Sequence, residues 1–215
     1  MCINNPELRE YNLKLIEDCA HQTPGISISS QHFADHGFCV CPRCVEKWRQ
    51  SGLNWTEWRA QTITGFLKEA KSLVKGTFAV EMYPDPVLAK ERFGIDFEQI
   101  AELVDYFHVP LSSRDYLTNY WADLLTRDFL KILKKPLVVE LSAEVLNEER
   151  IDALLKTVAY LSRHNLMGVL LLVYDSENAR QVCRYAVNNS AFREWIEKFE
   201  FTEMARIVEN WAKFY

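Results

Sequence analysis

Four cysteines constrain the fold of this 215-residue chain more than any other feature. Three of them form the cluster Cys39-x-Cys41-x-x-Cys44, and Gly37 and Pro42 beside them are typical of a tight loop. Three thiolates in such a loop can converge on one metal ion, at about 2.3 Å from each sulfur. The spacing therefore predicts a metal site, with the fourth ligand still to be assigned.

Cys2 is the first choice for the fourth ligand. Spacing alone leaves four alternatives, which are Cys19, His32, Asp35 and His36. Zn²⁺ binds four thiolates without any redox change, and a complete set of four leaves no open position for a substrate or a water. We therefore expect a structural zinc ion. Thiol redox chemistry at Cys41-x-x-Cys44 is a weaker interpretation, because the additional Cys39 favours metal.

The remaining cysteines and the composition indicate an ordinary intracellular protein. We expect Cys19 and Cys183 to pack as small apolar side chains on helices. Disulfide bonds are not expected, because the sequence shows no secretory leader. Hydrophobic residues make up 48% and charged residues 26%, which suits a single core. The net charge of -5 has no basic cluster, so no nucleic-acid partner is expected. The apolar run 167–174 is too short to span a membrane, and we expect a cytoplasmic location.

Strand and helix signals alternate along the chain, which predicts an α/β fold with a parallel sheet. The expected strands are 25–30, 77–83, 106–110, 137–141 and 169–173. The expected helices are 5–20, 42–50, 55–75, 96–104, 117–134 and 147–164, followed by three more that are capped by Ser176, Ser190 and Thr202. We expect one domain over 1–215, with a zinc-loop segment at 1–52 and C-terminal helices at 176–215.

Polar residues at the carboxyl ends of parallel strands are candidates for chemistry, because loop side chains converge there. Glu140 follows the aliphatic run 137–139, where a buried carboxylate costs several kcal/mol unless it has a partner or a function. A salt bridge is the alternative interpretation. The other candidates at strand ends are Gln31, His32, Glu81, His108 and Asp175. His108 is more simply a satisfied core histidine, and Asp175 more simply a helix cap.

Two segments of the chain resemble a known enzyme family. The stretch from Cys2 to Tyr11, and the loop Cys39-Val-Cys41-Pro-Arg-Cys44 followed by Trp48, look like the zinc-binding segment of glycoside hydrolase family 42, the bacterial and archaeal β-galactosidases. They are also similar to related glycoside-hydrolase-like barrels with a C-x-C-x-x-C loop. This resemblance implies that Cys2 is the fourth zinc ligand.

The resemblance continues through 104–107 and from 122 to 140, and it covers roughly residues 2 to 175. It implies that the five strands correspond to strands four to eight of a (β/α)₈ barrel, a partial TIM-type barrel with extra C-terminal helices. Glu140 falls at the position of the family's catalytic nucleophile. The open edges of such a sheet must be covered, either by the C-terminal helices or by a second copy, and we expect a homo-oligomer.

The sequence departs from the family at the second catalytic carboxylate. Retaining glycosidases need two carboxyl groups about 5 to 5.5 Å apart, and the family's acid/base glutamate corresponds here to Gln31 or His32. The amide of Gln31 cannot act as a general acid, so Glu81 or His32 would have to donate the proton instead. We therefore expect a glycoside-hydrolase-like protein of carbohydrate metabolism with a small carbohydrate ligand, and whether it catalyses hydrolysis stays open. The alternative is a non-catalytic module for carbohydrate binding or protein assembly.

Overall fold

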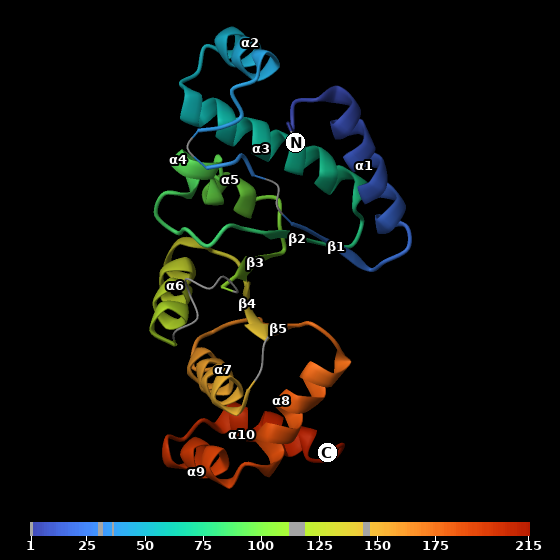
Figure 1. Ribbon diagram of the computed structural model, residues 1–215. Helices are drawn as coiled ribbons and strands as arrows, with labels where there is room; N and C mark the ends of the chain where they lie inside the picture. Colours follow the sequence, from blue (N-terminus) through green and yellow to red (C-terminus); the bar gives the residue numbers. More distant parts are fainter. Residues whose placement is uncertain (1, 30–31, 36, 112–118, 144–146) are drawn as a thin grey trace. The chain divides into compact units, whose positions relative to one another are not determined.

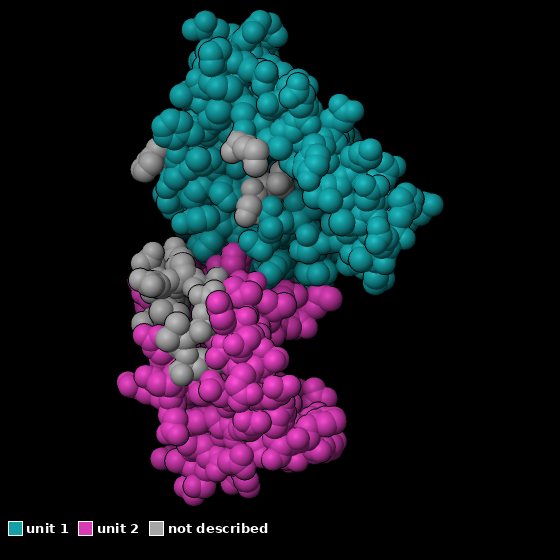
Figure 2. Space-filling view, turned by 45° about the vertical axis from the view of Figure 1, so that its right-hand side comes forward, with its two compact units in different colours: residues 1–109, 131–136 teal, residues 110–130, 137–215 magenta. Residues whose placement is uncertain are grey.

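The computed structural model describes residues 2–29, 32–35, 37–111, 119–143 and 147–215. The chain divides into two compact units, shown in teal and magenta in Figure 2. Unit 1 comprises Met1–Val109 and Lys131–Pro136, and unit 2 comprises Pro110–Leu130 and Leu137–Tyr215. The expectation of one domain over the whole chain stays a prediction.

The fold is α/β, and the strands follow one another in chain order, β1-β2-β3-β4-β5 (Figure 1). The strands are β1 Gly25–Ile28, β2 Thr77–Glu81, β3 Tyr106–Pro110, β4 Leu137–Ala143 and β5 Gly168–Val173. The helices are α1 Pro6–Ala20, α2 Pro42–Ser51, α3 Trp55–Leu73, α4 Ala89–Phe93, α5 Phe97–Ala101, α6 Asn119–Ile132, α7 Glu148–Leu161, α8 Ser176–Asn188, α9 Ser190–Lys198 and α10 Thr202–Trp211. The expected fold class, a partial parallel (β/α) barrel of about five strands with extra C-terminal helices, is confirmed.

Unit 1 is built on three parallel strands covered by helices. β1 pairs with β2 from Gly25 opposite Thr77, and β2 pairs with β3 up to Glu81 opposite His108. The long helix α3 packs beside α1 (Figure 1) and buries a helical stripe that includes Ile63 and Phe66. The central residues of β2 are fully buried, as expected for a strand with neighbours on both sides and helices over its faces.

Unit 2 contains the parallel pair β4 and β5, most of α6, and the helices α7 to α10. Six residue pairs join the two strands, from Val138 opposite Gly168 to Ala143 opposite Val173. The buried stripe of α7 includes Ile151 and Leu155. Among the described residues, no helix is long and apolar enough to cross a membrane.

The helix boundaries correct the three caps expected for the C-terminal helices. Asn5 and Asn147, where two of the expected helices begin, are the caps of α1 and α7, and their side-chain oxygens accept backbone N–H groups. Ser176, Ser190 and Thr202 are instead the first residues of their helices, one position after the caps. The capping side chains of α8 and α9 are Asp175 and Asn189, and α10 follows Phe201, which has no capping side chain. Asp175 and Asn189 stand one residue before the two serines, and their side-chain oxygens accept the backbone N–H groups of the first helical turns.

Two further expectations are corrected. Cys19 is exposed and is therefore not a core residue. None of the residues of its helix, α1, is buried. The five-residue helix α4 was not expected, because its sequence Ala-Lys-Glu-Arg-Phe is too short to show a helical period.

Candidate metal centre and strand-end residues

Four thiol groups meet in unit 1, and we call them the four-cysteine cluster. Its members are Cys2, Cys39, Cys41 and Cys44, and their sulfur atoms all lie within 4.8 Å of one another. The Cys2 Sγ lies 3.3 Å from the Cys44 Sγ and 3.7 Å from the Cys41 Sγ. The structure therefore brings the start of the chain to the loop that follows β1, as the expected ligand set requires.

Local structure places each sulfur. Cys41 precedes the first turn of α2, whose Pro42 begins the helix, and Cys44 lies in that turn with its side chain buried. Cys2 lies before Asn5, the cap of α1, and the Asn5 N–H donates to the Cys2 carbonyl oxygen at 2.9 Å. Cys2 is thus held at the start of α1, and Cys41 and Cys44 are held at the start of α2.

Polar groups around the sulfurs resemble the outer shell of a metal site. The buried Asn4 donates from Nδ2 to the Cys44 Sγ at 3.4 Å, and the Lys47 ammonium lies 3.4 Å from Asn4 Oδ1. The Cys44 backbone N–H donates to Cys41 and lowers the pKa of that thiol to about 7. Burial raises the pKa of the Cys39 and Cys44 thiols. Sequence reasoning did not identify Asn4, although its position two residues after Cys2 could have suggested it.

An aromatic cluster holds the cysteine loop against α3. The Trp55 indole Nε1 donates to the Gly37 carbonyl oxygen at 2.9 Å. The Trp55 ring stacks on Trp58 with centroids 4.9 Å apart, and it meets Trp48 edge-on at 5.2 Å. The loop is therefore fixed by contacts beyond its own sulfurs.

The geometry of the cluster fits zinc. A tetrahedral site with Zn–S distances of about 2.3 Å places its sulfurs ~3.8 Å apart. The Cys2–Cys41 separation of 3.7 Å matches this value, and the Cys2–Cys44 separation of 3.3 Å is shorter. Four soft thiolates form a ligand set that suits Zn²⁺ and offers no open coordination position. The hydrogen bond from the buried Asn4 amide to the Cys44 sulfur is typical of the groups that surround such ligands. The residues present thus fit a structural ion.

The strand-end candidates of unit 1 form a separate group. Glu81 ends β2, and its Oε2 lies 3.8 Å from Nδ1 of His108, its register partner on β3. His32 bonds through Nδ1 to the Phe33 carbonyl oxygen at 2.8 Å, and its ring meets Tyr83 and Phe93 edge-on. The structure thus pairs Glu81 with His108 and places His32 among aromatic rings. Gln31 lies outside the described residues.

The candidates of unit 2 are Glu140 and Asp175. Glu140 lies in β4 between buried neighbours and is itself buried, as its aliphatic context indicated. The Asp175 Oδ1 accepts the backbone N–H groups of Glu177 and Asn178, so this side chain caps α8. The preferred interpretation of Asp175 as a helix cap is confirmed.

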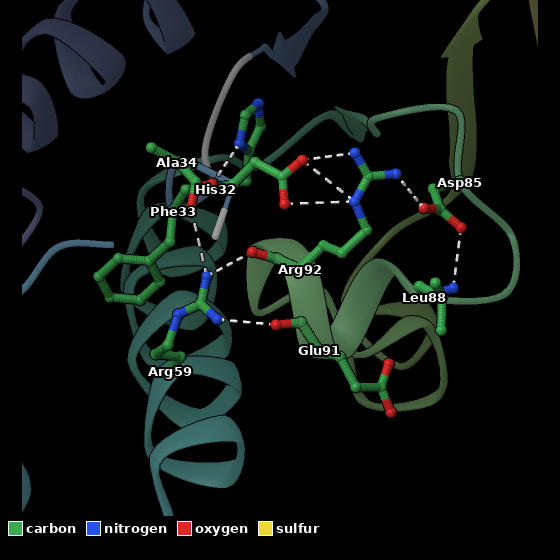
Figure 3. Close-up of polar contacts among 9 residues, drawn as sticks. His32, Phe33, Ala34, Arg59, Asp85, Leu88, Glu91 and Arg92 are labelled. Carbon is green, nitrogen blue, oxygen red and sulfur yellow. Dashed lines mark hydrogen bonds and ion pairs between the residues drawn. The ribbon is translucent and has the colours of Figure 1, made fainter. Parts of the chain in front are cut away.

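Two arginines that the sequence did not single out organise the loops after β1 and β2 (Figure 3). The Arg92 guanidinium donates to Asp35 on one side at 2.5 Å and to Asp85 on the other at 2.6 Å. These two carboxylates raise the pKa of Arg92 further above its usual value. Arg92 therefore ties the loop after β1 to the loop after β2.

Arg59 makes a second tie from inside the unit. Its side chain is 1% exposed and extends from α3 to the backbone carbonyl oxygens of Glu91 and Arg92, at 2.9 and 2.6 Å. A longer contact of 3.4 Å reaches the Ala34 carbonyl oxygen (Figure 3). Its guanidinium also lies over the Phe33 ring, 5.1 Å from the centroid. Burial lowers the pKa of Arg59, and the Asp35 carboxylate opposes that change.

Comparison with solved structures gives a distant likeness in fold. No family model and no curated protein sequence matches this chain. The structure is similar to that of dihydrodipicolinate synthase from Oceanobacillus iheyensis, with a TM-score of 0.30 and 12% sequence identity over 91% of this chain and 79% of that chain. A likeness at this TM-score carries no inference about function. The chain is a parallel α/β protein of the partial-barrel type, and its place in glycoside hydrolase family 42 is a proposal.

Proposed function

We propose that this chain is a zinc-stabilised, glycoside-hydrolase-like protein that binds carbohydrate. The observation that carries the proposal is the convergence of the four-cysteine cluster, whose sulfur atoms lie within 4.8 Å of one another. The resemblance to the zinc segment of family 42 rests on these same residues. Zinc here would join the start of the chain to the loop after β1, a structural task with no position for substrate.

Native mass spectrometry tests the metal assignment. We expect the purified chain to carry about one zinc ion, which Cys2→Ser removes or weakens strongly. Cys19→Ser is the matched control, because Cys19 is exposed on α1 outside the cluster. A metal-free wild type that keeps its full fold, or equal zinc content in Cys2→Ser and Cys19→Ser, would contradict the assignment.

For catalysis, we propose Glu140 as the nucleophile and Glu81 or His32 as the proton donor. A carboxylate in an aliphatic strand costs several kcal/mol unless contacts or a function compensate, and Glu140 is buried in β4. Glu140 belongs to unit 2, whereas Glu81 and His32 belong to unit 1. The roles therefore rest on the resemblance and on the local environment of each side chain.

A panel of nitrophenyl glycosides tests these roles. If the chain is a hydrolase, we expect wild type to cleave one of them and Glu140→Gln to lose at least about a thousand-fold in kcat, because the covalent step is removed. Glu194→Gln, an exposed glutamate of α9, is the matched control and should keep full activity. Equal rates for wild type and Glu140→Gln, or no cleavage by either, would eliminate the enzyme hypothesis.

A pocket in unit 2 favours the non-catalytic alternative, a carbohydrate-binding module. Its volume is about 450 Å³, and it is lined by Asn147, Glu148, Ile151, Gln181, Arg184, Tyr185, Asn188 and Asn189. Primary amides both donate and accept hydrogen bonds, as sugar hydroxyls do. Binding of a saccharide that survives Glu140→Gln and is lost in Gln181→Ala would support this function over catalysis.

Self-association is the remaining proposal for a partner. β5 is last in the strand order, and Leu170 and Leu172 on it are 44% and 39% exposed. Apolar edge strands are common places for chains to pair. That a second copy covers this edge stays a prediction.

A further inference from the structure

A pocket between the start of α6 and the end of α7, within unit 2, combines arginines with aromatic rings. Its volume is about 470 Å³, and it is lined by Tyr120, Asp123, Arg127, Tyr160, Arg163 and His164. This size is within the range of small-molecule sites. Neither the four-cysteine cluster nor any of the strand-end candidates takes part in it.

Asp123 organises one side of this pocket. Its Oδ1 lies 2.7 Å from the Nε2 of His164, and its Oδ2 pairs with the guanidinium of Arg127. The carboxylate thus holds both basic side chains in place. It neutralises one positive charge, and the Arg127 side chain remains 53% exposed to receive a ligand.

Arg163 is held on the other side by different contacts. Its Nη2 donates to the Phe199 carbonyl oxygen at 2.7 Å, and its guanidinium lies over the Phe201 ring, 4.0 Å from the centroid. A guanidinium has five N–H donors, so these contacts fix Arg163 and still leave donors for an anion. Two arginines against one aspartate leave the pocket with an excess of positive charge.

Two more features favour an anion that carries an organic group. Tyr120 is 65% exposed and lines the pocket from the first turn of α6. The Tyr160 ring is fixed edge-on against Phe201, with centroids 5.3 Å apart, and is 37% exposed. Paired guanidinium groups match the oxygens of a phosphate better than a single point charge does.

We propose that this pocket binds a phosphate monoester, with the phosphate between Arg127 and Arg163 and the organic group against the tyrosine rings. The proposal is independent of zinc and of the carbohydrate function. A sugar phosphate and an aryl phosphate share this chemistry, and inorganic phosphate alone would fill the pocket only in part.

Titration of the full ¹⁵N-labelled chain tests the proposal, with inorganic phosphate, glucose 6-phosphate, phenyl phosphate and phenol as probes. We expect saturable amide shifts at residues 120–127 and 160–164, with the two esters binding more tightly than inorganic phosphate and phenol not binding. Arg127→Gln should weaken ester binding about ten-fold or more, because one charge-assisted contact is lost. Arg163→Gln should do the same.

Arg206→Gln is the matched control, because Arg206 pairs with Glu203 on α10 and does not line the pocket. Should Arg163→Gln fail to fold, the half-exposed Arg127 still decides the outcome. Absence of saturable shifts at tens of millimolar phosphate or ester would overturn the proposal. So would equal ester affinity in wild type and Arg127→Gln, which would show that the charges serve only the structure.

Discussion

Removing zinc with a chelator should lower the free energy of unfolding of the wild-type chain by about 4 kcal/mol. This value follows from linkage when free zinc is about 1,000 times its Kd and the unfolded chain binds none. The physical reason is that the ion would join segments up to 42 positions apart, Cys2 and Cys44, through bonds much stronger than the hydrogen bond from Asn4 to Cys44. Denaturant unfolding followed by fluorescence measures the effect, since Trp55 contacts the cysteine loop directly.

Variants separate the zinc contribution from ordinary packing. Cys44→Ser should unfold at lower denaturant concentration than wild type and should no longer respond to chelator. Cys19→Ser should behave as wild type in both respects, because this thiol is exposed. A chelator response of the same size in Cys44→Ser and wild type would rule out zinc at the cluster.

The chelator response should also depend on pH. Burial raises the pKa of the Cys39 and Cys44 thiols in the metal-free fold, so both are protonated at neutral pH and must release protons to bind zinc. Falling pH then favours the protonated, metal-free form. Less chelator should therefore be needed to strip zinc as the pH decreases below neutral.

The convergence of the clustered cysteines was predictable because its signal is local and chemical. Three thiols within six residues have few structural explanations, and a tight loop brings them together whatever surrounds it. Cys2 was harder, since a pairing over 37 positions depends on tertiary structure, and the resemblance supplied what spacing could not. Cys19 was assigned to the core because cysteine is usually buried, but α1 has no buried residue.

The strands were predictable from their apolar runs and from the glycines and prolines between them. β3 has the bounds that its sequence indicates, whereas β1 ends at Ile28, before the expected Ser30. Strand ends depend on pairing partners, which a single sequence does not contain. The same limit explains the cap corrections, because Asp175 and Asn189 compete with the serines that follow them.

Arg59 and Arg92 could not have been predicted, because each stands in an ordinary helical context. Arg59 stands in the mixed stretch Glu57-Trp58-Arg59-Ala60-Gln61 of α3, where an arginine usually extends to solvent. Arg92 belongs to the charged run Lys90-Glu91-Arg92, which is typical of an exposed helix. Their roles appear only when α4 and the loop after β1 are brought to α3, so no local pattern in the sequence encodes them.

Replacing the buried arginine of this network, by Arg59→Met, should lower the free energy of unfolding by about 3 kcal/mol or more. Methionine fills similar space but leaves the carbonyl oxygens of Glu91 and Arg92 buried without their donor. Each unsatisfied oxygen costs about 1–3 kcal/mol of stability. The loop after β1 and helix α4 should then separate from α3, because Arg59 is bonded to both. Denaturant unfolding measures the loss, and hydrogen exchange locates it.

Two further arginine variants make this prediction specific. Arg49→Met, on the exposed face of α2, should change stability by less than about 0.5 kcal/mol. Arg92→Met should fall between, at about 1 kcal/mol, because this side chain is 36% exposed and water can solvate the carboxylates it leaves. If Arg59→Met were as stable as Arg49→Met, the carbonyl oxygens would be satisfied in some other way, and the buried guanidinium would not hold these loops. If hydrogen exchange increased evenly over unit 1 instead of at residues 32–35 and 89–93, Arg59 would stabilise the unit as a whole and would not act as a local tie.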